Sequence, residues 1–386
     1  MNDAVPATRP LRVVIVAGEA SGDQLGAALM QALRARFPAV QFAGIGGPRM
    51  RAAGCECWHD AATLTVMGLV EVLPHLPRLL RIRRQLIARV LALQPDVYIG
   101  VDFKEFNLSV ARRLKARGVR TVQYVSPQVW AWREGRARTI GQACDEVLCL
   151  LPFEPAFYQR FGVQARFVGH PLADEIPLEA DRAAARAALG LSASAPVLAL
   201  LPGSRAGEVG RLGADFVAAA RLLLARHPGL QCVAPMAGEG AARLFREAGA
   251  EAAGIRLLDG QARVALQAAD VALVASGTAS LEALLCRCPM VVAYRLGGIT
   301  ALLLRWLRLV KLAHFSLPNL LAGEGLVPEF FQGAVTPAAL AAAVETQMAP
   351  GPGRERQLVR FRAIHESLRQ GGAARAADAI AALVGR

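Results

Sequence analysis

The sequence predicts an α/β protein made of two similar halves, each built on a parallel sheet. Short apolar runs bounded by Gly, Pro or Asp alternate with longer Ala-, Leu- and Arg-rich stretches of helical period, which is the pattern of βα units. The halves also repeat one another. A strand leads into VAGEASGD in the first half and into LLPGSRAGE in the second, and later in each half an Asp-led strand runs into a polar turn.

Nine runs are expected to be strands, because each is short, apolar and rich in β-branched residues. In chain order they are 13–17, 40–45, 97–101, 120–125, 146–150, 197–201, 231–234, 271–275 and 290–294. The stretches between them are predicted to be largely helical, and so is the final stretch from 354 to 384.

The domain boundary is predicted at Gly169 to Pro177 (GHPLADEIP), because of its prolines and its central position. We therefore expect an N-terminal domain over 1–175, a C-terminal domain over 176–353 and a helical segment over 354–386. We expect that segment to pack back on the N-terminal domain or on a partner subunit, and a homodimer is a separate expectation.

Composition excludes several classes of protein. Hydrophobic residues make up 54% of the chain and charged residues 19%, which excludes disorder as the dominant state. The net charge of +13 indicates a polyanionic partner, either nucleic acid, a phosphorylated substrate or an anionic membrane surface. The lysines are Lys104, Lys115 and Lys311, and none follows a glycine, so the P-loop of an NTPase is absent.

The seven cysteines include no Cys-x-x-Cys pair and no histidines at zinc-finger spacing, so we expect reduced, mostly buried thiols in a cytoplasmic protein. The first apolar run is too short for the core of a signal peptide. The longest uncharged stretch, 187–204, contains prolines and serines, which argues against a transmembrane helix. Any contact with a membrane is therefore expected to be peripheral.

In the second half, two strand-to-helix turns are candidates for binding an anion. Ser204 and Arg205 in LPGSRAGE can form an anion clamp, although a solvated arginine is the simpler interpretation. The small residues 276–278 of ASGTASLE permit close backbone approach at a helix start. Glu282, about one turn into that helix, suits a pair of ribose hydroxyls or, more simply, the helix dipole.

In the first half, two carboxylates follow predicted strands. Glu19 lies in GEASGD, whose amides are expected to face a ligand, and a plain capped turn is the alternative. Asp102 in GVDFKEFN ends a strand where open α/β sheets place reacting groups, so it is a candidate general base. A turn-forming aspartate is the alternative there. Two tryptophans in YVSPQVWAWR line a cleft or pack in the core.

Ten motifs in this order resemble the bacterial lipid-A-disaccharide synthase family, glycosyltransferase family 19: GEASGD, GIGGPRM, VMGLVEVL, GVDFKEFN, YVSPQVWAWR, FVGHPLAD, LPGSR, ASGTASLE, CPMVVAYR and SLPNLLAG. The resemblance runs from about Val13 to about Gly323. It implies the GT-B fold, in which two Rossmann-like domains with parallel sheets face each other across a cleft that holds a sugar nucleotide.

The resemblance also implies a reaction of lipid A biosynthesis in Gram-negative bacteria. UDP-2,3-diacylglucosamine is joined to 2,3-diacylglucosamine 1-phosphate (lipid X), which releases UDP and forms a β-1,6 disaccharide 1-phosphate with inversion. No cofactor and no metal is implied, in line with the missing Asp-x-Asp motif. The implied partners are the two lipid substrates and the cytoplasmic surface of the inner membrane, and not nucleic acid. The implied location is cytoplasmic and peripheral at that membrane.

Carried over by motif, the implied catalytic residues are Asp102, which deprotonates or orients the acceptor 6-hydroxyl, and Glu19, which is the alternative base. The implied substrate-binding residues are Ser21, Arg205, Glu208, Ser276, Gly277, Thr278, Glu282 and Asn319. The chain departs from the family where Phe103 and Lys104 follow the aspartate, because the family usually has a small residue and then proline there.

Three other functions compete with this interpretation. A Rossmann dehydrogenase requires Gly-x-Gly-x-x-Gly, which the chain lacks. A non-catalytic basic protein that binds nucleic acid or a membrane would carry stacking aromatics if its ligand were single-stranded nucleic acid, but aromatics are 6% of the chain. Another GT-B UDP-N-acetylglucosamine-type transferase, such as the muramyl-pentapeptide enzyme, shares the Gly-Thr loop but not GEASGD or VSPQVWAW.

Most of the net charge lies in two windows without acidic residues, 72–95 and 283–323. In each, arginines accompany apolar residues at helical spacing, which is typical of basic amphipathic helices at an anionic interface, while solvated helix faces are the alternative. The expected membrane-contacting residues are Arg78, Arg81, Arg84, Arg305, Trp306, Arg308 and Lys311.

Overall fold

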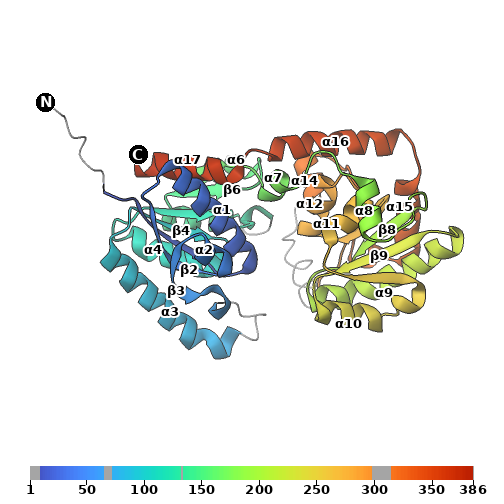
Figure 1. The fold of residues 1–386 in the computed structure, drawn as a ribbon, viewed down its shortest axis with the longest axis horizontal. Coiled ribbons are helices and arrows are strands. Elements are labelled where there is room, and N and C mark those ends of the chain that lie inside the picture. Colours follow the sequence, from blue (N-terminus) through green and yellow to red (C-terminus); the bar gives the residue numbers. More distant parts are fainter. Residues whose placement is uncertain (1–8, 65–71, 132–133, 298–313, 386) are drawn as a thin grey trace. The chain divides into compact units, whose positions relative to one another are not determined.

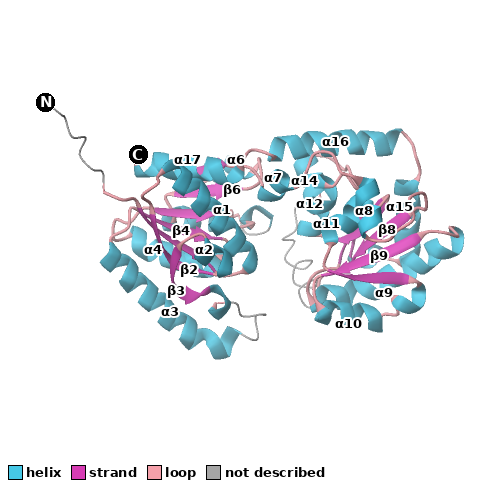
Figure 2. Cartoon of the chain, in the orientation of Figure 1, coloured by secondary structure: helices cyan, strands magenta, loops and turns pink. Residues whose placement is uncertain are grey.

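The computed structural model describes residues 9–64, 72–131, 134–297 and 314–385. The chain forms two compact units, Met1–Asp174 together with Leu368–Arg386, and Glu175–Ser367. Each unit is a parallel sheet covered by helices (Figures 1 and 2). This confirms the predicted α/β class.

The first unit contains a seven-stranded sheet in the order β3-β2-β1-β4-β5-β6-β7. Its strands are β1 (Arg12–Ala17), β2 (Gln41–Gly46), β3 (Cys55–Asp60), β4 (Val97–Val101), β5 (Thr121–Tyr124), β6 (Glu146–Cys149) and β7 (Ala165–Phe167). Its helices are α1 (Ala20–Arg36), α2 (Pro48–Ala52), α3 (Val72–Leu93), α4 (Lys104–Lys115), α5 (Arg136–Ala143), α6 (Glu154–Gln159) and α17 (Gly372–Val384), while α7 (Pro171–Glu175) ends at the boundary.

The second unit contains a six-stranded sheet in the order β10-β9-β8-β11-β12-β13. Its strands are β8 (Val197–Leu201), β9 (Gln231–Met236), β10 (Ile255–Asp259), β11 (Val271–Ala275), β12 (Met290–Tyr294) and β13 (Glu329–Phe331). Its helices are α8 (Arg182–Ala188), α9 (Ala206–Arg226), α10 (Glu239–Glu247), α11 (Ala262–Ala268), α12 (Thr278–Leu285), α14 (Leu317–Ala322), α15 (Pro337–Met348) and α16 (Pro352–Leu368).

The side chains of β1 point alternately to the two faces of the first sheet, and both faces are covered. Val13 and Ile15 pack in one core cluster with residues of α1 and α17, while Val14 and Val16 pack in another with residues of α3 and α4. A strand buried on both faces has no polar face to present, which is why it is a continuous apolar run in the sequence.

All nine predicted strands are present, with ends that agree within two residues. Four further strands were not predicted: β3, β7, β10 and β13. They are the outermost strands of the two sheets. Edge strands are only partly covered, so their sequences CECWHD, ARF, IRLLD and EFF lack the unbroken apolar run of a central strand.

The C-terminal stretch is divided between the two units, whereas we expected one segment over 354–386. Helix α16 lies in Glu175–Ser367 except for its last residue, and α17 packs against α1 in the first unit. The Asp174 carboxylate accepts hydrogen bonds from the N–H groups of Gly371 and Gly372, at 2.9 and 2.7 Å. The end of the expected linker therefore caps the start of α17.

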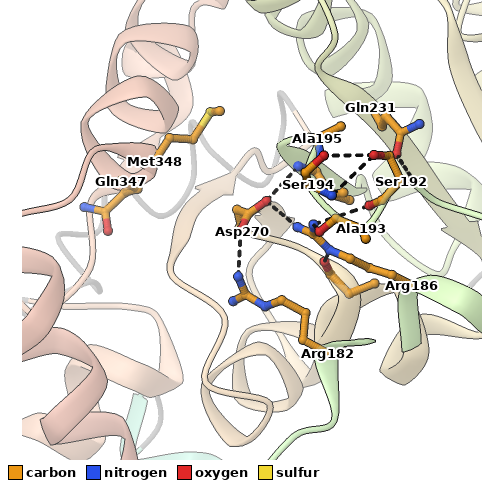
Figure 3. Close-up of polar contacts among 12 residues, drawn as sticks. Arg182, Arg186, Ser192, Ala193, Ser194, Ala195, Gln231, Asp270, Gln347 and Met348 are labelled. Atoms are coloured by element: carbon orange, nitrogen blue, oxygen red, sulfur yellow. Dashed lines mark hydrogen bonds and ion pairs between the residues drawn. The ribbon is translucent and has the colours of Figure 1, made fainter. Parts of the chain in front are cut away.

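An ion pair between the buried Arg186 and the half-buried Asp270 holds the amino-terminal ends of the two central strands of the second sheet (Figure 3). Asp270, directly before β11, accepts hydrogen bonds from Val197 N–H of β8 and from the buried guanidinium of Arg186, at 2.8 and 2.7 Å. The Arg186 guanidinium also donates to the carbonyl oxygens of Ala193 and Ala268. These contacts hold β8 and β11 in register. The register in turn determines how the loops at the carboxyl ends of the two strands lie relative to each other.

Two other expectations concern the whole chain. All seven cysteines are free thiols and six are buried, as predicted. Among the helices of the described ranges, none combines the length and the apolar character that crossing a membrane requires.

Candidate active site

The second unit contains a cavity of about 430 Å³ at the carboxyl ends of β8, β9, β11 and β12. It is lined by six of the residues that the motifs implied: Arg205, Glu208, Ser276, Gly277, Thr278 and Glu282. Their separation in sequence is bridged by the pairing of β8 with β11, because neighbouring parallel strands end at the same edge of the sheet.

The loop after β8 is held in shape by Glu208. One oxygen of its carboxylate, Oε2, accepts hydrogen bonds from the N–H groups of Ser204 and Arg205, at 3.0 and 3.3 Å. Gly203 has φ +131°, and a Cβ there would clash with Glu208. Glu208 thus lines the cavity and at the same time fixes the turn that carries the exposed Arg205 side chain.

The loop after β11 exposes the start of a helix to the cavity. Gly277, with φ +149°, is the N-cap of α12, a conformation that favours glycine. The Ser280 hydroxyl donates to the Gly277 carbonyl at 2.7 Å and closes the turn. Thr278 and Ala279 line the cavity, and amides of a first helical turn lack partners within the helix and attract anions.

Glu282 is half-buried beside this loop. Burial raises the pKa of its carboxyl group, and the Arg263 guanidinium lowers that pKa while the Glu175 carboxylate raises it. Arg263 and Glu175 form an ion pair at 3.1 Å. A carboxylate kept in a partly dehydrated place at the cavity wall is a strong acceptor for hydroxyl groups.

Part of the cavity wall was not predicted from the sequence. The last two residues of β9, Pro235 and Met236, also line it, as do Ala237, Gly260 after β10 and Tyr294 in β12. The sequence offered one indication of these residues, namely that each lies at or after the carboxyl end of a strand in the same sheet. Because the edge strand β10 was not recognised, the turn at Gly260 could not be placed.

Asn319 does not line this cavity. Its side chain is buried, and Oδ1 accepts hydrogen bonds from the N–H groups of Leu326 and Val327, both at 2.8 Å. Its Nδ2 donates to the carbonyl oxygen of Val327 at 2.9 Å. Its hydrogen bonds therefore hold the chain that follows α14, whereas the resemblance implied a substrate-binding role.

The first unit brings Glu19, Ser21 and Asp102 to one edge of its sheet. Ala17 of β1 pairs with Val101 of β4, so the chain leaves both strands at the same level, into Gly18 and Asp102. Glu19 is the N-cap of α1, and both Glu19 and Ser21 are exposed.

Asp102 stands on a strained stretch of backbone. Asp102 and Phe103 have φ values of +48° and +36°, and each such residue costs on the order of 1–3 kcal/mol. Burial raises the pKa of the Asp102 carboxyl, while the N–H of Phe103 and the ammonium of Lys104 lower it. The Phe103 ring occupies the space beside Gly18, where a Cβ would lie 2.6 Å from it.

Trp130 takes the packing role rather than exposing its ring. It contacts Phe153 edge-to-face, with ring centroids 5.0 Å apart, and its indole N–H donates to Glu154 Oε1 at 3.1 Å. The second tryptophan of this segment, Trp132, lies outside the described residues.

The arginine-rich helix α3 differs from the expected interfacial helix. Ile82, Leu86 and Val90 are buried in the core beneath the sheet, so this apolar stripe serves folding and is not available to enter a bilayer. Arg78, Arg81 and Arg84 are exposed. The other expected membrane-contacting residues, Arg305, Trp306, Arg308 and Lys311, lie outside the described residues.

Comparison with known proteins places this chain in a family. A family model described as lipid-A-disaccharide synthetase matches residues 13–383. The lipid-A-disaccharide synthase of Pseudomonas aeruginosa (strain LESB58) is 54% identical over 378 residues, which cover 97% of this chain and 99% of the relative. That of Xanthomonas euvesicatoria pv. vesicatoria (strain 85-10) is 52% identical over 381 residues, which cover 97% and 87%.

Solved structures with low sequence identity share the fold. The glycotransferase of kitacinnamycin superposes with a TM-score of 0.65 at 19% identity, covering 98% of this chain and 100% of that one. The UDP-GlcNAc 2-epimerase from Neisseria meningitidis bound to UDP-GlcNAc gives 0.62 at 11% identity, covering 93% and 99%. These likenesses confirm the GT-B class of two parallel-sheet α/β domains. Matched over almost its whole length by the family model and by close relatives, the chain belongs to the lipid-A-disaccharide synthetase family.

Proposed function

We propose that this chain transfers the diacylglucosaminyl group of UDP-2,3-diacylglucosamine to the 6-hydroxyl of 2,3-diacylglucosamine 1-phosphate, forming the lipid A disaccharide 1-phosphate and UDP. The observation that carries the proposal is the cavity of the second unit, where Arg205, the start of α12 and Glu282 meet. This set offers a cation and helix amides for a diphosphate and a carboxylate for a ribose.

On the donor side, the leaving group is UDP, whose charge grows as the bond from its oxygen to the sugar C1 breaks. The guanidinium of Arg205 and the first-turn amides of α12 neutralise that charge, and the helix fixes the amides in place before the reaction. Ser276, Gly277 and Thr278 let the diphosphate approach the backbone, and Glu282 accepts hydrogen bonds from the ribose hydroxyls.

On the acceptor side, Asp102 takes or orients the proton of the 6-hydroxyl while its oxygen forms the new bond to C1. Attack on the face opposite to UDP inverts the configuration and gives the β link. Glu19, two residues beyond the end of the neighbouring strand, is the alternative base. Asp102 must be ionised to act as the base, so catalysis through it declines as the pH falls through its pKa.

The substitution Asp102→Asn tests the base assignment. We expect turnover to fall by about 10²- to 10⁴-fold, the range typical of a lost general base, with unchanged affinity for UDP because the UDP residues lie in the other unit. Glu19→Gln is the matched comparison on the adjacent strand end. Near-normal turnover in Asp102→Asn, with loss in Glu19→Gln, would transfer the role to Glu19.

The remaining partners follow from the chemistry of the substrates. Both substrates carry acyl chains, so we propose that the enzyme works at the cytoplasmic surface of the inner membrane as a peripheral protein. The exposed arginines of α3 support attraction to an anionic surface. Since α17 packs on α1 of its own chain, the C-terminal segment supplies no argument for a homodimer.

A further inference from the structure

Two neighbouring strands of the first unit end in a backbone conformation that their residues normally avoid. Asp102 and Phe103 follow β4 with φ of +48° and +36°, and Val125 follows β5 with φ of +74°. A β-branched residue at positive φ is a genuine outlier. Such strain persists only where the surroundings impose it, so neighbouring side chains must hold these strand ends.

Two buried amides hold them. The Nδ2 of Asn107 and the Nε2 of Gln123 both donate to the carbonyl oxygen of Asp102, each at 3.0 Å. The two side chains are 0% and 1% exposed. They fit behind β4 because residue 100 is glycine, since a Cβ there would lie 2.7 Å from Asn107 and 3.1 Å from Gln123.

The orientation of both amides is forced by their neighbours. The Asn107 nitrogen faces the carbonyl oxygens of Val16, Val101 and Asp102, and its oxygen accepts from the Tyr98 hydroxyl at 3.0 Å. The Gln123 nitrogen faces the carbonyl oxygens of Asp102, Tyr124 and Val125. A flipped amide would set its oxygen against three carbonyl oxygens.

Gln123 is held there at a cost. Its Oε1 is buried and has no hydrogen-bond partner among the described residues, and a buried acceptor without a partner is destabilising. A residue selected for stability alone would avoid that loss.

The peptide between Asp102 and Phe103 links the amides to the carboxylate. In a trans peptide the C=O and the N–H point in opposite directions. With the carbonyl of Asp102 drawn toward the two amides, the N–H of Phe103 points away from them, and this N–H lowers the pKa of the Asp102 carboxyl.

We propose that Asn107 and Gln123 are positioning residues for Asp102, which fix the 102–103 peptide and thereby the backbone from which the Asp102 carboxylate reaches the acceptor. The proposal rests on the proposed role of Asp102. It also explains the buried ends of the motif GVDFKEFN, because Gly100 provides the space and Asn107 provides the donor.

Several groups set the charge of this carboxylate. Phe103 N–H and the Lys104 ammonium of α4 favour its ionised form, and burial opposes it. On the adjacent strand β1, Glu19 lies just beyond the strand end. The neighbouring strand β5 contributes Gln123, which is neutral. Removing either amide frees the 102–103 peptide, so that the Phe103 N–H is no longer held in one direction and stabilises the ionised carboxylate less, which raises the pKa of Asp102.

The test uses the full chain with Gln123→Met, which keeps the volume but removes the donor, and with Asn107→Leu. Thr121→Val is the matched control, because Thr121 is buried at the other end of β5 and its hydroxyl donates to Ala143 O. The pKa of Asp102 is measured directly by 13C NMR of labelled aspartate carboxyls in the absence of substrate, with Asp102→Asn assigning the signal. The pH profile of kcat/KM is measured in parallel.

We expect Gln123→Met to raise the pKa of Asp102 by about one unit, to shift the acidic limb of the profile by the same amount and to lower kcat at neutral pH. UDP affinity should stay within about twofold of the parent protein, and Thr121→Val should move neither the pKa nor the limb.

An unchanged pKa of Asp102 in folded Gln123→Met, with kcat lowered equally at all pH values, would overturn the proposal, because a purely structural role gives that result. If Asn107→Leu fails to fold, Gln123→Met alone decides the question. A raised pKa together with an active Asp102→Asn would keep the positioning of Asp102 and refute its role as the base.

Discussion

The half-buried Glu282 and the buried Glu154 show how burial of a carboxylate serves two different roles. Burial raises the pKa of both Glu282 and Glu154. Glu282 lines the cavity of the second unit, whereas Glu154 is enclosed and accepts hydrogen bonds from Trp130 Nε1 and Leu151 N–H, at 3.1 and 3.0 Å. The first is therefore expected to act on a ligand and the second on stability.

Replacing Glu282 by Ala should weaken UDP binding on the order of tenfold or more, because hydrogen bonds from the ribose to a charged acceptor are lost. Calorimetric titration measures the affinity. The matched ligand is 2′,3′-dideoxy-UDP, which lacks the ribose hydroxyls and should bind both proteins alike. An equal loss for the two ligands would show that Glu282 does not contact the ribose.

Glu154 makes stability depend on pH. Burial raises its pKa to about 7, above the ordinary value of a glutamate, so the folded state binds more protons than the unfolded state between about pH 4.5 and pH 7. The free energy of unfolding contributed by this group therefore falls as the pH rises through that interval.

In Glu154→Gln this contribution is absent, so the drop in Tm between pH 5 and pH 8 should be smaller than in the parent protein. Thermal unfolding followed by circular dichroism gives both values. The same drop in the two proteins would mean that Glu154 stays ionised throughout.

At the scale of elements, the central strands were predictable and the edge strands were not. Val97–Val101 and Val271–Ala275 are buried along their whole length, so hydrophobicity alone defined their ends. β10 (IRLLD) is buried only at its first residue. Its pairing with β9 depends on a neighbour that a local pattern does not contain.

The site followed the same rule. Residues at the ends of central strands, such as Asp102 and Ser276, were predicted, because a polar residue after an apolar run is visible in sequence. The dual role of Glu208 and the internal hydrogen bonds of Asn319 depend on the shape of a loop. A helix that packs on a core and a helix that lies on a membrane have the same amphipathic pattern. The sequence of α3 therefore could not tell these two roles apart.

The ion pair of Asp270 allows two arginines of one helix to be compared. Arg186 is buried and Arg182 is 44% exposed, and both contact Asp270 at 2.7 Å. Arg186→Ala leaves a carboxylate near the core with fewer partners and should lower the free energy of unfolding by about 3–5 kcal/mol, whereas Arg182→Ala should cost about 0–1 kcal/mol.

Urea unfolding of both variants measures this difference. Equal losses would show that the contact with Asp270 is not what stabilises the ends of β8 and β11.

At the scale of the whole molecule, the net charge of +13 has a functional interpretation in terms of lipid substrates. Because Ile82, Leu86 and Val90 of α3 are buried, we expect the exposed arginines beside them to act on a membrane electrostatically. Binding through Arg78, Arg81 and Arg84 should then weaken steeply with salt.

Changing Arg78, Arg81 and Arg84 to Glu should reduce association with anionic vesicles by at least about tenfold at low salt, since each basic residue near such a surface contributes about 1 kcal/mol. Vesicle sedimentation measures the bound fraction. The control with the same charge change replaces the exposed Arg221, Arg243 and Arg246 of α9 and α10, and it should lose less. Equal losses would assign the effect to net charge rather than to α3.

The family membership and the cavity together make one claim about the whole enzyme, namely that it couples two lipid-linked sugars with loss of UDP. The most direct test is UDP release by the purified chain, measured with each substrate alone and with both together. We expect UDP only when UDP-2,3-diacylglucosamine and 2,3-diacylglucosamine 1-phosphate are both present, in an amount equal to that of the disaccharide formed. UDP release from the donor alone at the same rate, or no disaccharide with both substrates present, would contradict it.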